Sequence, residues 1–156
     1  MTRQTISWLA VLTLALSVTG GCDWVREKLG LGYMVVAPEE ESPEWVVQQV
    51  LKASTMEPFE DAWAEYQKYL HSSELTPAAL QSWETLRFPA LRRKHTCFLR
   101  TEEGQYAYEV MERVEERDDY MQLRVSCKTT DVPTPCHLFQ DPEQDGKWRI
   151  KMNCLN

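Results

Sequence analysis

The amino-acid sequence predicts an α+β domain in which three amino-terminal helices pack on a curved antiparallel meander sheet. Apolar residues recur at helical spacing between Ser42 and Leu86, and from Lys94 onward they alternate with polar residues, as is typical of strands. Short polar turns separate the later segments, and such turns join neighbouring antiparallel strands. Helices followed by a run of strands indicate an α+β layout.

The three helices are predicted from their starts and from their apolar stripes. Ser42-Pro43 and Thr76-Pro77 each place a hydroxyl N-cap before a proline, which is favoured in the first helical turn. The stripes are Val46, Val47, Val50 and Leu51, then Phe59, Ala62, Trp63, Tyr66 and Leu70, then Leu80, Trp83 and Leu86. We interpret them as core. Pro89 is expected to interrupt the chain after the third helix.

Five strands are expected after the helices. Their ranges are 96–101, 106–115, 120–129, 136–140 and 147–153. The alternation is clearest in the third strand, where Met121, Leu123 and Val125 are separated by polar residues. One face of this strand is therefore expected to lie in the core.

Composition limits the class of protein. The chain has 156 residues, which is room for one domain with short appendages. Its formal net charge of −7 opposes contact with phosphate backbones, so we expect no nucleic-acid binding. An apolar fraction of 43% and six tryptophans are enough for a packed core, which argues against a disordered chain.

The amino-terminal segment predicts export followed by lipidation. A polar start with Arg3 precedes an apolar run over 6–18, which is too short to span a bilayer and fits a signal peptide. The segment L-S-V-T-G-G-C, ending at Cys22, resembles the lipobox of bacterial lipoproteins, although Thr19 stands where leucine is usual. The resemblance implies cleavage before Cys22, a diacylglyceryl thioether on its sulfur and N-acylation. An ordinary secretory signal with an incidental cysteine is the alternative.

The chain is therefore expected to have three parts: a signal peptide over 1–21, a lipidated anchor and linker over 22–41, and an α+β domain over 42–156. Asp23 resembles an inner-membrane retention signal, but the rule varies between lineages, so the choice between inner and outer membrane stays open. The segment 23–36 is expected either to lie on lipid headgroups or to dock on the domain.

Three segments within the domain suggest a family. S-P-E-W-V-V-Q-Q-V-L, F-E-D-A-W and D-G-K-W-R-I look like uncharacterised bacterial lipoproteins of the nuclear-transport-factor-2-like fold, over 42–153. The resemblance implies a cone-shaped domain. That superfamily contains ketosteroid-isomerase-like enzymes as well as binding modules, so the fold alone does not decide the function.

The remaining cysteines predict two disulfides. They are Cys97, Cys127, Cys136 and Cys154. An even number in an exported domain favours disulfides over free thiols. A hairpin turn at 129–134 would place Cys127 opposite Cys136, and Cys97 would then pair with Cys154.

A zinc site is the rival interpretation of these cysteines. His95 lies near Cys97 and His137 follows Cys136, so histidine and cysteine ligands occur close together. The sequence has no C-x-x-C motif, and thiolates would have to survive an oxidising compartment. We therefore expect neither a metal nor a cofactor.

No standard catalytic motif is present, whether a glycine-rich phosphate loop, a nucleophile elbow or H-E-x-x-H. If the first two expected strands pair, His95 faces Glu112 in the interior, and such a pair is able to do acid–base chemistry. A shift of one residue would send both side chains outward. His71 is interpreted as a helix-end residue, and Arg92-Arg93-Lys94 as a solvated corner or a contact for anionic lipid or an acidic partner.

The sequence favours a membrane-anchored envelope lipoprotein, facing the periplasm, whose domain is a binding or protein-interaction module. Its partner would be an envelope protein or a small ligand, and the membrane would be contacted through Cys22. The alternative is a small cone-fold isomerase or dehydratase that uses His95 and Glu112. A purely structural role in a larger envelope assembly is the third hypothesis.

Overall fold

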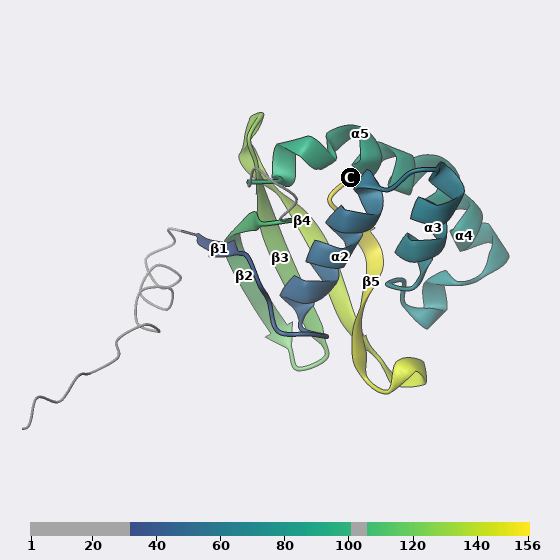
Figure 1. Ribbon diagram of the computed structural model, residues 1–156. Coiled ribbons are helices and arrows are strands. Elements are labelled where there is room, and N and C mark those ends of the chain that lie inside the picture. Colours follow the sequence, from purple (N-terminus) through teal and green to yellow (C-terminus); the bar gives the residue numbers. More distant parts are fainter. Residues whose placement is uncertain (1–31, 101–105) are drawn as a thin grey trace, which may run out of the picture.

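A computed structural model describes residues 32–100 and 106–156 of the chain (Figure 1). In chain order its strands and α-helices are β1 (Tyr33–Val35), α2 (Pro43–Thr55), α3 (Phe59–Gln67), α4 (Pro77–Ser82), α5 (Phe88–Phe98), β2 (Tyr108–Arg117), β3 (Tyr120–Cys127), β4 (Thr130–Asp141) and β5 (Lys147–Cys154). Short helical turns add η1 (Ser72–Glu74), η2 (Trp83–Arg87) and η3 (Pro142–Gln144). The predicted signal peptide and Cys22 lie outside the described residues.

The strands form one antiparallel sheet in the order β1-β2-β3-β4-β5. The helices cover one face of this sheet, and α2 lies across its middle (Figure 1). The predicted α+β class and the antiparallel meander are confirmed. β1 comes from the segment assigned to the linker, so the folded part includes residues before Ser42.

The two predicted helix starts are confirmed. The Ser42 side chain accepts a hydrogen bond from the Trp45 backbone N–H at 3.1 Å, and Thr76 caps Ala79 in the same way at 3.4 Å. The apolar stripe of α2 is completely buried, since Val46, Val47, Val50 and Leu51 are 0% exposed. Local capping and helical periodicity therefore determine these elements.

The expected break at Pro89 is wrong, because α4 continues through η2 into α5. The turn η2 is a π-helical turn in which the Phe88 N–H bonds the Trp83 carbonyl. Pro89 then lies in the first turn of α5, where its missing N–H costs little. The wider π-helical turn therefore accommodates the proline, and the helical chain continues into α5.

The expected strand over 96–101 is also wrong, because residues up to Phe98 belong to α5. Phe88, Leu91 and Phe98 are all buried and lie on one helical face, with His95 between them at the same spacing. The short alternation around Cys97 was therefore part of a longer helical pattern.

The strand register rejects the expected disulfide pairing. β4 begins at Thr130, and its Cys136 lies opposite Leu123 rather than Cys127. The disulfides join Cys97 to Cys127, which links α5 to β3, and Cys136 to Cys154, which links β4 to β5. The prediction of two disulfides is confirmed, but the pairing of Cys127 with Cys136 and of Cys97 with Cys154 is wrong.

Over 32–100 and 106–156, no helix has both the length and the apolar character that crossing a bilayer requires.

Candidate functional site

A hollow of about 500 Å³ lies at the amino end of α2, and we call it the α2 groove. β1, the connection to α2, the first turn of α2 and one residue of β2 form its walls. The lining residues are Tyr33, Met34, Val35, Val36, Ala37, Pro38, Glu39, Ser42, Pro43, Glu44 and Arg113. Apolar side chains and a small polar centre line the groove together, as is common for ligand sites.

The polar centre is the carboxylate of Glu44, which is only 9% exposed. It accepts hydrogen bonds from the Tyr33 hydroxyl and from Arg113 Nη1, each at 2.8 Å. Both bonds end on Oε1, and Oε2 takes part in neither. Glu44 lies in the first turn of α2, where the helix dipole stabilises a negative charge.

The position of Arg113 depends on an irregularity in β2. Val110 pairs with Val125, but the register then shifts, so that Glu112 pairs with Arg124 and Arg113 with the buried Leu123. An extra residue in one strand exchanges the faces of the side chains that follow it. Arg113 therefore lies on the helix-covered face of the sheet and reaches Glu44, while its side chain stays partly exposed.

Burial and neighbouring charges determine the protonation of this centre. Burial, with the nearby Glu44, raises the pKa of Tyr33 and of Tyr108, whose hydroxyl donates to the Glu44 backbone carbonyl at 2.7 Å. Burial lowers the pKa of Arg113, but the carboxylates of Glu44 and Glu115 outweigh it and keep the pKa raised. At neutral pH both tyrosines are neutral donors and Arg113 is a cation. The arrangement suits binding of a polar group better than proton transfer.

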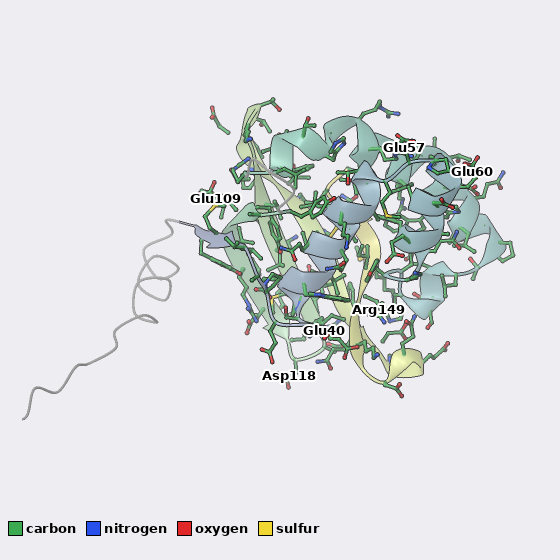
Figure 2. All side chains as sticks on the ribbon, viewed as in Figure 1. Glu40, Glu57, Glu60, Glu109, Asp118 and Arg149 are labelled. Carbon is green, nitrogen blue, oxygen red and sulfur yellow. A yellow bond between two sulfur atoms is a disulfide. The ribbon has the colours of Figure 1, made fainter. Side chains whose placement is uncertain are left out.

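A second hollow, of about 350 Å³, begins on the other side of Arg113. It is lined by Arg113, Glu115, Glu116, Arg117, Asp118, Met121 and Trp148. Figure 2 labels Asp118 and Glu40 at this end of the molecule. Arg113 therefore contributes to both hollows, and carboxylates outnumber cations around them.

The structure does not bring the predicted pair His95 and Glu112 together. His95 lies in α5, where its Nδ1 is 2.6 Å from the Arg92 carbonyl oxygen. Glu112 is exposed on β2 and pairs with Arg124 at 3.2 Å. The expected interior position of Glu112 is wrong because of the shift in β2, and the expected facing strand is a helix.

His71 and Arg92 have structural partners. His71 is not at the carboxyl end of a helix; it caps η1, and its Nδ1 accepts the Ser73 N–H at 3.1 Å. Arg92 donates to the Met56 carbonyl at 3.0 Å. Arg93 and Lys94 line a separate hollow of about 260 Å³ beside Cys97.

The cysteines and histidines considered as zinc ligands have other bonding partners. The four cysteines form disulfides and therefore offer no thiolate. His137 Nδ1 lies 2.9 Å from the Tyr120 hydroxyl. In the two described ranges, no three histidine, cysteine or acidic side chains gather in a way that would hold a metal ion.

Sequence reasoning missed Tyr33, Glu44 and Arg113. The acidic residue after the capped Ser42-Pro43 start was the one signal for Glu44, since such residues are favoured at helix starts. Nothing local indicates that three segments so far apart in the chain meet.

Comparisons with protein-family models, with curated proteins and with solved structures found no match to this chain.

Proposed function

We propose that the protein is a lipoprotein of the bacterial cell envelope, anchored through Cys22 and facing the periplasm, and that its domain is a binding or protein-interaction module. The lipobox-like segment before Cys22 supports the anchor. Two disulfides are typical of proteins folded in oxidising compartments, which supports export.

We also propose that the domain has the cone-like form of the nuclear-transport-factor-2-like proteins. The antiparallel meander shows register irregularities in the β2–β3, β3–β4 and β4–β5 pairings. Such irregularities bend strands and increase their twist, which favours a sheet that curves around a helix. The position of α2 across the sheet supports this proposal.

The anchor is tested by replacing its sulfur. We expect Cys22→Ser to abolish incorporation of radiolabelled palmitate and to leave an uncleaved or soluble protein, because no thioether forms. Thr19→Leu is the matched control, and it should be labelled at least as well as the parent. Labelled Cys22→Ser protein, or an unlabelled parent, would contradict the anchor.

The binding site of the module is proposed to be the α2 groove. The observation that carries this assignment is the ion pair between the buried Glu44 and the partly exposed Arg113 on the wall of the hollow, with one carboxylate oxygen outside both of its bonds. Burying the carboxylate of Glu44 costs desolvation free energy, so its position in a hollow favours a binding role over a purely stabilising one. The partner would donate a hydrogen bond to Glu44 Oε2.

Photo-crosslinking in envelopes tests this site. A photoreactive amino acid at Glu39, on the wall of the groove, should give a discrete adduct that mass spectrometry identifies. The matched control places the same group at Glu84, which is exposed on η2. Absence of an adduct at Glu39, or identical adducts at both positions, would contradict the groove as the binding site.

A further inference from the structure

The chain leaves the folded domain toward Cys22 at a fixed point on the sheet edge. Gly32 has φ +62°, and a Cβ atom there would lie 2.9 Å from the Val110 carbonyl oxygen and 3.1 Å from Met111 Sδ. A side chain would not fit, so Gly32 allows the backbone to lie tightly against β2. The exit is therefore part of the fold.

Three exposed apolar side chains surround this exit, and we call them the exit edge. They are Met34 at 43%, Val36 at 49% and Met111 at 36% exposure. Met34 and Val36 also line the α2 groove, so the exit edge and the groove adjoin. Met34 lies opposite Glu109 on β2, which Figure 2 labels beside β1. The other large exposed apolar residues in the described ranges are Leu75, Leu86, Val132 and Met152, which come from other elements.

Covalent geometry holds the exit edge close to the lipidated residue. Ten residues separate Cys22 from Tyr33, so the chain between them spans at most about 40 Å in any conformation. That limit is about the diameter of a domain of this size. With acyl chains on Cys22 in the bilayer, the exit edge stays within about 40 Å of the lipid.

We propose that the exit edge lies against the lipid bilayer in the anchored protein, which orients the domain on the membrane. This inference rests on the proposed lipidation of Cys22. Three apolar side chains are too few to bind a bilayer alone, but a short tether keeps them at high local concentration beside it. The charge of Glu109 within this surface is offset by Arg100, 3.6 Å away.

The alternative occupant is a protein that covers the same apolar residues. The tether favours lipid, because it acts in the absence of any partner and requires no complementary shape. Neutral lipid is expected to suffice, because the side chains of the exit edge are apolar.

A fluorescent label tests the contact in the acylated full-length chain. Cys22 is acylated and the other four cysteines are in disulfides, so Met34→Cys supplies the free thiol for an environment-sensitive nitrobenzoxadiazole label. In phosphatidylcholine vesicles we expect a blue shift of its emission and loss of most of that emission when doxyl-labelled lipid is added. Val36→Cys should behave in the same way, which guards against local damage at Met34.

Leu86→Cys is the matched control. Leu86 is a more exposed apolar residue, at 67%, on η2 beside α4, at the opposite side of the molecule from β1 (Figure 1). Its label should keep the emission seen in water and should not be quenched. Equal quenching at 34 and 86, or no quenching at 34 and 36, would overturn the oriented contact.

Mass spectrometry of the Cys22 peptide in the same preparation separates the two proposals. An unmodified Cys22 overturns both the anchor and the exit-edge contact. An acylated Cys22 with an unquenched label at 34 and 36 overturns the contact alone. A label at 34 or 36 that is shielded from water in native envelopes but is not quenched in vesicles would also overturn the lipid contact. The exit edge would then be covered by a protein.

Discussion

Asp141 shows how one buried charge joins distant parts of the chain. Its carboxylate is 0% exposed and accepts hydrogen bonds from the Ser72 N–H and hydroxyl, both at 2.7 Å, and from the Glu143 N–H at 3.0 Å. Burial raises the pKa of Asp141, but these hydrogen bonds and nearby His71 outweigh it and hold the pKa below its ordinary value of 3.8. Asp141 therefore links η1 to the end of β4 through hydrogen bonds.

We expect Asp141→Asn to lower the free energy of unfolding by about 1.5–3 kcal/mol at pH 7, because bonds to a charged acceptor are lost. A carboxylate whose pKa is depressed by folding stabilises the protein above its unfolded pKa, and this is lost as the pH falls through the folded pKa. The difference between parent and variant should therefore shrink in acid. Urea unfolding of parent and variant at pH 7 and in acid measures this difference in the free energy of unfolding.

Asp145→Asn is the control for this prediction. Asp145 is exposed in the left-handed region at φ 56°, a conformation that asparagine tolerates. Its variant should unfold like the parent. An Asp141→Asn protein as stable as the parent at pH 7 would contradict the structural role of the charge.

β1 shows how a short element is held by its neighbours rather than by its own propensity. It has three residues, lies at the edge of the sheet and pairs with β2. Val35 points into the core and is 5% exposed, whereas Met34 points outward. The Tyr33–Glu44 hydrogen bond adds a link to α2.

Two substitutions on the same strand test this docking. Val35→Asp should lower the free energy of unfolding by about 3–5 kcal/mol, because it buries an unpaired charge. Met34→Gln, on the exposed face, adds no charge opposite Glu109 and should change it by no more than about 0.5 kcal/mol. Urea denaturation of both variants gives the comparison, and equal effects would show that β1 is not docked as described.

In the molecule as a whole, the two disulfides have different surroundings. Cys97 and Cys127 are 8% and 7% exposed, line a hollow, and connect the helical layer to the sheet. Cys136 and Cys154 are 0% exposed and lie within the sheet. Thiol–disulfide exchange requires the attacking thiolate to reach a sulfur atom.

A small thiol reductant should therefore cleave Cys97–Cys127 first in the native protein. Cys136–Cys154 should react only when the sheet opens. Alkylation followed by peptide mapping at increasing times measures the order. Equal rates under native conditions, or earlier loss of Cys136–Cys154, would contradict this prediction.

Local signals were enough for several elements. Ser42 and Thr76 define helix starts by bonds within one turn, and the stripe of α2 identifies its buried face. The alternation of Met121, Leu123 and Val125 identified the inner face of β3, and all three are buried. The even number of cysteines predicted two disulfides.

Contacts between distant segments decided the rest. An irregularity in β2 turned Arg113 inward and Glu112 outward, and the long helix α5 carried His95 away from the predicted pair. The register of β3 and β4 selected the disulfide partners, and docking against β2 made a strand from the segment at Tyr33. Local sequence signals determined two helix starts, the apolar faces of α2 and β3, and the α+β class, because those follow from neighbours along the chain. The groove and its charges depend on register and packing, which are energies of contact between segments far apart in the sequence.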